Sequence, residues 1–161
     1  MKTNKTIKLI AIALFGLSAA TIPASAQRNG AQHTKPHSHK EGHADHMLAG
    51  YAAVADSLYK DNLVVAKAAA AGMVKHDKKS SMAPAAAKLA KSSTIAEARK
   101  NFLALSKTAI KVAKGNKGWH VMYCPMAFDN KGASWLQKSS EKRANNPYFG
   151  KEMPHCGKMV K

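Results

Sequence analysis

The sequence of 161 residues contains few acidic side chains, few cysteines and few aromatic residues. Nine aspartate and glutamate residues stand against 26 lysine and arginine residues, and there are two cysteines and 6% aromatic residues. No glycine-rich phosphate loop, nucleophile elbow or paired-carboxylate arrangement is visible in it. These patterns mark many enzymes that can be recognised from sequence, so we expect a protein that is not an enzyme.

Long apolar runs are also absent, except for one near the start of the chain. Lysines open the sequence, an apolar run covers residues 9–22, and the small residues Ala24 and Ala26 flank Ser25. This order is typical of a secretory signal peptide, here residues 1–26, cleaved between Ala26 and Gln27. The run is shorter than the roughly 20 residues of a membrane span. We therefore expect export to a bacterial periplasm and no membrane span in the mature chain.

The formal net charge of +17 raises the question of a polyanionic partner. In a cytoplasmic protein, such a charge would favour nucleic acid. Export removes that partner, and the cations are scattered lysines with few arginines or aromatic residues between them. The sequence therefore predicts a solvated, lysine-rich surface and no nucleic-acid binding.

Residues 27–46 contain no leucine, isoleucine, valine or aromatic residue. Such a segment buries too little apolar surface to offset its ordering entropy, so we expect it to be disordered. Its histidines are His33, His37, His39, His43 and His46. Two interpretations remain open for them: weak capture of a metal ion by imidazole, and a polar tether that happens to be rich in histidine.

Three helical patterns follow. Residues 47–75 are alanine-rich and periodic, which favours a helix, and a short helix is expected over residues 83–91, with Pro84 in its first turn. The third helix starts at a capping box of Thr94 and Glu97, continues with apolar residues at three- and four-residue steps, and ends before Gly115. The apolar positions expected on one face of the first helix are Tyr51, Val54, Leu58, Val65 and Ala69. Apolar stripes of this kind predict an antiparallel helical bundle.

The composition changes again after Gly118, where both tryptophans and three of the six prolines lie. Residues 119–124 and 155–161 are predicted as short strands, and residues 132–139 as a helical turn. We expect a compact C-terminal cap, with a two-stranded ribbon as one form of it, packed on the bundle through Trp119, Trp135, Tyr148 and Phe149. The predicted fold class is mainly α, with one domain over residues 47–161.

The two cysteines, Cys124 and Cys156, have two alternative interpretations: a disulfide and a metal site. In an exported protein they are first a disulfide candidate, and closing a loop of about 33 residues would contribute roughly 3–4 kcal/mol. Their neighbours are soft ligands, however. Met126 follows Cys124 after one proline, and in an extended chain residues two apart point to the same side. Met153 and His155 stand beside Cys156.

Thiolate and thioether ligands select cuprous copper, and silver for the same reason, over hard cations. The candidate ligands are Cys124, Met126, Met153, Cys156 and His155, with Met122, Met159 and His120 nearby. Zinc prefers a tetrahedral set of cysteine and histidine. His120 and His155 would complete such a set with the two cysteines, so zinc remains an alternative.

The tail resembles a known family. The stretches "YCPMAF" and "WLQKSSEKRANNPYFGKEMPHCG", together with "ARKNF" in the third predicted helix, are similar to a periplasmic domain family of unknown function. That family occurs as small exported proteins and fused to the C-terminus of adaptor subunits of copper and silver efflux systems. The resemblance covers about residues 47–161 and implies a helical fold, a role in copper handling, and ligands at Cys124, Met126, Met153 and Cys156. His155, directly before Cys156, could add an imidazole ligand.

Two functions of different classes follow. The first is a periplasmic copper chaperone or buffer that delivers cuprous ion to an efflux adaptor or another periplasmic copper protein. The second is a disulfide-stabilised protein-interaction module without specific metal binding. A redox form, in which the site binds copper when reduced and closes as a disulfide when oxidised, is compatible with both.

Overall fold

The computed structural model describes residues 39–160, and side chains from residue 42 onward. These residues belong to one unit of the chain, Pro36–Lys161. The predicted signal peptide and two of the candidate ligands, His33 and His37, lie outside the described residues. Among residues 39–160, no helix is both long enough and apolar enough to cross a membrane.

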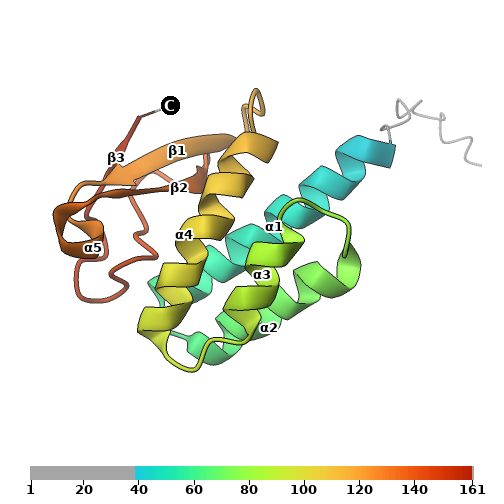
Figure 1. The fold of residues 1–161 in the computed structure, drawn as a ribbon. Helices are drawn as coiled ribbons and strands as arrows, with labels where there is room; N and C mark the ends of the chain where they lie inside the picture. Colours follow the sequence, from blue (N-terminus) through green and yellow to red (C-terminus); the bar gives the residue numbers. More distant parts are fainter. Residues whose placement is uncertain (1–38, 161) are drawn as a thin grey trace, which may run out of the picture. The chain divides into compact units, whose positions relative to one another are not determined.

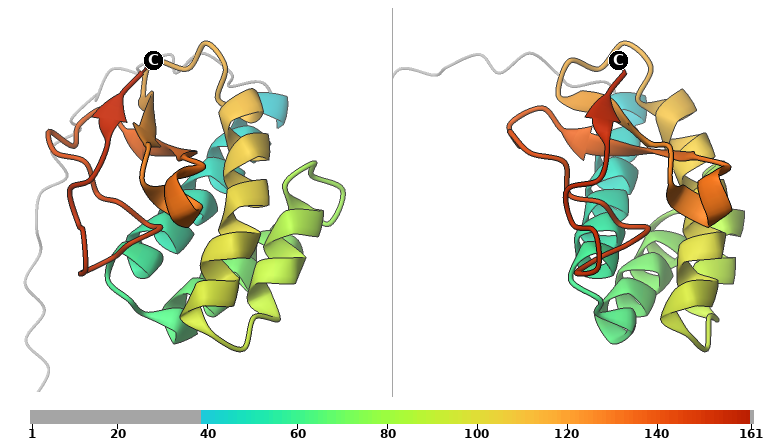
Figure 2. Two further views of the ribbon diagram at one scale, coloured as in Figure 1. Left: turned by 60° about the vertical axis from the view of Figure 1, so that its left-hand side comes forward. Right: turned by 90° about the vertical axis from the view of Figure 1, so that its left-hand side faces the viewer.

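Five helices and three strands follow one another in the described part of the chain (Figure 1). They are α1 (His39–Tyr59), α2 (Leu63–His76), α3 (Ala83–Ala90), α4 (Ile95–Val112), β1 (Trp119–Cys124), α5 (Ala127–Asn130), β2 (Ala133–Lys138) and β3 (Lys158–Met159). The mainly α fold with a small β part confirms the predicted fold class. The sheet packs against α4 and α1, while α2 and α3 lie on the other side of these two helices (Figures 1 and 2).

The first predicted helix is two helices. The chain breaks at residues 60–62, where Asp61 adopts a positive φ of 56°. The side chain of Asn62 then accepts a hydrogen bond from the backbone N–H of Val65 and caps the start of α2. Asparagine is a strong N-cap residue, so the Asp-Asn pair overrides the apolar periodicity that suggested one continuous helix.

The predicted disorder of residues 27–46 is wrong for residues 39–46, because α1 begins at His39 rather than at Met47. Met47 and Leu48 are buried, and extending an existing helix costs far less than nucleating a new one. In this part of α1, the rings of His43 and His46 both lie next to His76 at the end of α2. These polar residues are therefore ordered because they continue the buried part of α1 and lie next to the end of α2. They do not need an apolar core of their own.

The other two helices follow the prediction closely. Pro84 lies in the first turn of α3. At the start of α4, the Thr94 hydroxyl accepts a hydrogen bond from Glu97 N–H, and the Glu97 carboxylate accepts one from Ser93 N–H. The apolar stripe of α4 is buried through Ala98, Phe102, Leu105 and Ala109. Capping and periodicity agree here, which explains why the sequence predicted this helix well.

The cap contains a three-stranded antiparallel sheet in the order β2-β1-β3. The prediction of strands at residues 119–124 and near the C-terminus is confirmed, but that of a helical turn at residues 132–139 is wrong, because Ala133–Lys138 forms β2. Its Trp135 and Leu136 are both buried, so this strand is covered on both faces and lacks the alternation of a half-buried strand. Tyr148 is also buried, and Trp119 and Phe149 are partly buried against the same core.

Candidate metal centre

Cys124 and Cys156, here called the cysteine pair, meet at the end of β1. Cys124 is the last residue of β1, and Cys156 precedes β3, which pairs with β1 through Tyr123 and Lys158. Antiparallel pairing brings the two segments together, although they are 32 positions apart in sequence. The two Sγ atoms lie 2.6 Å apart, and both residues are unbonded thiols.

The two thiols differ in exposure. Cys124 is fully buried, whereas Cys156 is half-buried. The pKa of the Cys156 thiol is raised to about 11, chiefly by burial and then by the adjacent Cys124 thiol, while the backbone N–H of Met126 acts to lower it. At neutral pH the Cys156 side chain is therefore a protonated thiol, and a metal ion would have to displace its proton to bind.

The separation of the sulfur atoms tests how well the cysteine pair fits a metal ion. A metal–thiolate bond is about 2.3 Å long, so two thiolates on one tetrahedral ion lie about 3.7 Å apart. The observed 2.6 Å is shorter. A metal site would therefore form by an outward shift of about 1 Å, most easily at Cys156, which lies outside the strands. The donor set fits a soft ion, provided that the pair opens.

Met126 lies beside this pair, but not in the extended conformation expected from the sequence. Its φ of −82° and ψ of −12° are helical, and its side chain is 47% exposed. Pro125 and Met126 form a turn at the end of β1, so the thioether does not share a strand face with Cys124. The backbone N–H of Met126 is instead directed at the Cys156 sulfur. Met126 thus stands at the exposed side of the pair.

The segment after Met126 has an unusual backbone. Phe128, Asp129 and Asn130 all have positive φ values, between 54° and 64°. A left-handed conformation costs roughly 1–2 kcal/mol per residue for side chains other than glycine. The Phe128 ring packs edge-on against the ring of Tyr148, with centroids 5.3 Å apart. This packing helps to offset the cost, and the turn fixes where Met126 lies relative to the pair.

Two further methionines lie on the same face of the sheet as Cys124. Met122 precedes Cys124 by two positions on β1, so both side chains point to one face. Met159 is the antiparallel partner of Met122, which puts its side chain on that face as well. Met122 is buried and Met159 is 58% exposed. A row of sulfur-bearing side chains therefore runs from the edge of the sheet to the cysteine pair.

The remaining predicted ligands lie on the C-terminal segment. The Met153 carbonyl accepts a hydrogen bond from Cys156 N–H at 3.3 Å, and its side chain is half-buried. His155 Nδ1 lies 2.7 Å from the Ala144 carbonyl, and its ring lies 6.4 Å from that of Tyr59. His155 therefore has a backbone partner of its own and is exposed.

The alternative zinc set of Cys124, Cys156, His120 and His155 is not assembled. Across residues 39–160, no three histidine, cysteine or acidic side chains form a group that could hold a metal ion. Within residues 39–160 the cysteine pair is thus a group of two thiols, and the further sulfur atoms on its face of the sheet belong to methionines.

Asn146 positions Cys156, a role that the sequence patterns of metal ligands did not predict. Its side chain is fully buried, donates to the Cys156 carbonyl at 2.7 Å, and accepts from Tyr148 N–H at 2.8 Å. Its own N–H donates to the Pro154 carbonyl. Gly157 approaches Trp135 so closely that a Cβ there would lie 2.5 Å from the ring. The Asn-Pro and Cys-Gly pairs are the sequence features that could have indicated that Asn146 and Gly157 support Cys156.

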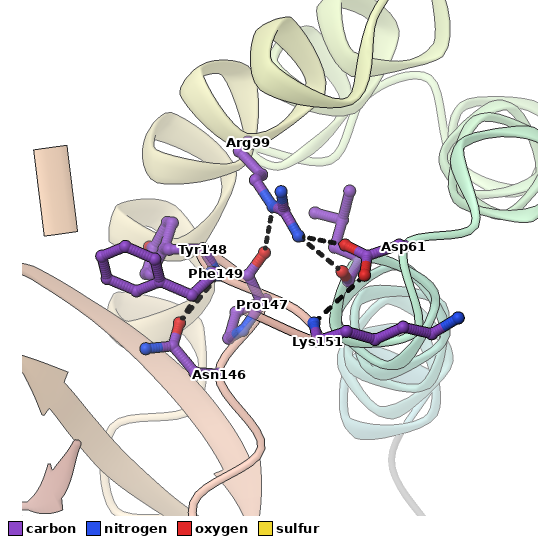
Figure 3. Close-up of polar contacts among 8 residues, drawn as sticks. Asp61, Arg99, Asn146, Pro147, Tyr148, Phe149 and Lys151 are labelled. Carbon is purple, nitrogen blue, oxygen red and sulfur yellow. Dashed lines mark hydrogen bonds and ion pairs between the residues drawn. The ribbon is translucent and has the colours of Figure 1, made fainter. Parts of the chain in front are cut away.

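A second set of contacts ties this segment to the helices (Figure 3). The Arg99 guanidinium on α4 donates to the carbonyls of Pro147 and Leu58 and forms an ion pair with Asp61. The Asp61 carboxylate also accepts from Lys151 N–H at 3.1 Å. We call these contacts the Arg99 clamp. Through it, the ends of α1 and α4 hold the loop that leads to Cys156.

The candidate centre therefore consists of the cysteine pair, with Met126 at its exposed side and Met122 and Met159 along the sheet. Asn146, Gly157 and the Arg99 clamp hold the loop that carries Cys156. These supporting residues fall in the stretches "NNPYFG", "HCG" and "ARKNF", which carried the family resemblance. No family model, curated protein or solved structure matches this chain.

Proposed function

We propose that this protein binds a soft metal ion, cuprous copper first and silver second, and acts as a periplasmic chaperone or buffer. The observation that carries the proposal is that two thiols from separate segments meet, with sulfur atoms 2.6 Å apart, beside the turn that carries the exposed side chain of Met126. Thiolate and thioether donors favour Cu(I) over hard cations. A disulfide alone would not account for the surrounding methionines.

The exposure of these ligands suits transfer of the ion. Cys124 is fully buried and would anchor it, whereas Cys156 is half-buried, and Met126 and Met159 are exposed. A partner could therefore replace the outer ligands first, while the inner thiolate still holds the ion. The resemblance of the tail to a domain found on copper efflux adaptors supports such an adaptor, or another periplasmic copper protein, as the recipient.

A second function is favoured by two features of the same site. The sulfur atoms are already closer than a shared metal ion requires, and burial disfavours the thiolate of Cys156. Both features suit a disulfide that stabilises the cap of a protein-interaction module. Both states are available to one protein if the pair binds copper when reduced and closes when oxidised.

A titration with Cu(I) under a competing chelator tests the first function. The chain from Gln27 onward is reduced and compared with the Cys124→Ser and Cys156→Ser variants. We expect about one tightly bound ion in the parent and at least a hundredfold weaker binding in each variant. Since α1 begins at His39, deletion of residues 27–38 is the control for the histidine-rich segment, and it should leave tight binding in place. Unchanged stoichiometry and affinity in both serine variants would refute the assignment.

A further inference from the structure

A groove of about 550 Å³ opens between the C-terminal end of α4 and the start of β1, which are joined by residues 113–118 (Figure 1). Ile110, Trp119, Val121 and Leu136 provide its apolar lining. Leu136 is buried and the other three are half-buried, so this lining is recessed but accessible. The volume falls within the range of about 300–1,000 Å³ that is typical of ligand pockets.

The strands explain this apolar lining. Trp119 and Val121 are two positions apart on β1, and such side chains point to the same face of a sheet. Leu136 is the antiparallel partner of Val121 on β2, which puts it on that face as well. Cys124 belongs to the other face and lies about 17 Å from Trp119 along the strand. The groove is therefore separate from the cysteine pair.

The lysines of the groove belong to a larger positive surface. Lys111, Lys114 and Lys117 line the groove and are exposed, and no acidic side chain is among its lining residues. Lys100 and Lys107 are also exposed, and they precede Lys111 by eleven and four residues, which puts all three on one face of α4. We call these five residues the lysine stripe. None of them forms an ion pair within the described part of the chain.

Charge and shape together indicate what this surface binds. The lysine stripe extends for about 17 Å between Lys100 and Lys111, which exceeds the reach of one carboxylate and matches a chain that carries several. The recessed apolar lining suits a side chain that projects from such a chain, since apolar anchors in pockets supply much of the binding energy of protein interfaces. A flat membrane surface of anionic headgroups would contact the lysines but would not fill the groove. A second copy of this protein is a poor occupant, because it has nine acidic residues against 26 basic ones.

We infer that the groove and the lysine stripe form a docking surface for an acidic segment of a different protein. One large apolar side chain of that segment would lie in the groove against Trp119, and its carboxylates would pair with the lysine stripe. The surface shares no residue with the cysteine pair, so docking does not require a bound metal ion. Because the attraction is between exposed charges, it should weaken as the salt concentration rises.

Binding of short synthetic peptides to the chain from Gln27 onward tests this inference, measured by fluorescence anisotropy at low salt with a metal chelator present. The peptides carry glutamates on both sides of a central phenylalanine, and serine replaces the phenylalanine in a matched set. We expect the phenylalanine peptides to bind, and the serine peptides to bind at least about tenfold more weakly. Lys111→Glu/Lys114→Glu should also weaken binding at least about tenfold, since each reversal turns an attraction into a repulsion.

Lys131→Glu/Lys151→Glu is the matched control, because it changes the net charge equally at two exposed lysines that do not line the groove. It should bind the peptide as the parent does, and circular dichroism should show the same fold for both double variants. Equal weakening by the two variants would overturn the inference, as would equal binding of the two peptide sets. Binding to phosphatidylglycerol vesicles but to no peptide would also overturn it. Cys124→Ser/Cys156→Ser should bind the peptide unchanged, so failure here leaves the copper proposal untouched.

Discussion

At the scale of single residues, the most specific chemical prediction concerns the reactivity of the Cys156 thiol. Its thiol has a pKa of about 11, raised first by burial and then by the neighbouring Cys124 thiol. Because thiolate is the reactive form, alkylation of Cys156 by iodoacetamide should be slow at pH 7.5. It should become about tenfold faster per pH unit until pH approaches 11.

Mass spectrometry of the reduced protein, resolved by cysteine, measures these rates. In urea-unfolded protein, the rate should level off near pH 9, the ordinary value for this thiol. A folded-state rate that also levels off near pH 9 would show that burial does not protect Cys156 in solution.

Met126 is the residue that separates metal binding from packing. It is 47% exposed next to the cysteine pair, so Met126→Leu should change the stability of the fold little while removing a thioether ligand. We expect Cu(I) affinity to fall about tenfold, which is about 1.4 kcal/mol. Val160→Ala is the matched control, because the Val160 side chain is also 47% exposed but carries no metal-binding atom. Equal effects of the two variants would remove the special role of Met126.

Residue types alone indicated which residues lie together at the candidate site, but not their conformation. Cys124, Cys156 and Met126 were identified because soft ligands cluster around the only two cysteines. The predicted extended conformation of Met126 was wrong. Nothing in Cys-Pro-Met indicates the left-handed turn at Phe128–Asn130, because that turn depends on packing against Tyr148.

At the scale of elements, the Arg99 clamp joins α4, the end of α1 and the C-terminal loop. Arg99 is largely buried and has three partners. Arg99→Ala would leave the Asp61 carboxylate and two carbonyls without this donor, so we expect a loss of about 2–3 kcal/mol in the free energy of unfolding. Urea denaturation measures this loss.

Lys60→Ala provides the matched control for the clamp, since Lys60 forms an ion pair with Asp56 on the surface of the same region. Exposed pairs contribute little, so this variant should unfold close to the parent. A similar, small effect of both variants would show that the clamp does not hold the cap to the helices.

Elements with strong local signals were predicted, and those that depend on neighbours were not. α4 has both a capping box and a regular apolar stripe, so its bounds followed from sequence. The break between α1 and α2 depends on Asp61 and Asn62, and Asp61 is held in place by Arg99 and Lys151 from distant segments. β2 was mistaken for a helical turn because Trp135 and Leu136 are both buried, so the alternation of a half-buried strand is missing.

At the scale of the whole molecule, the redox state of the cysteine pair should set stability. Closing the pair constrains the unfolded chain over about 33 residues and should add roughly 3–4 kcal/mol to the free energy of unfolding. Urea denaturation of the oxidised and reduced protein measures this difference. The Cys124→Ser/Cys156→Ser variant should behave like the reduced protein under both conditions. Identical curves for oxidised and reduced parent would show that the pair does not close.

In the proposed function, the cysteine pair on the sheet would offer sulfur to a soft monovalent ion. Export and the lysine-rich surface remain predictions from the sequence, and they are compatible with the proposed copper site.

X-ray absorption at the copper edge tests the central claim most directly. The reduced chain from Gln27 onward is loaded with one equivalent of Cu(I), and the scattering atoms around the ion are identified. We predict a shell of two or three sulfur atoms at about 2.3 Å, lost in Cys124→Ser/Cys156→Ser. A shell of nitrogen or oxygen alone in the parent protein would contradict copper binding by the cysteine pair.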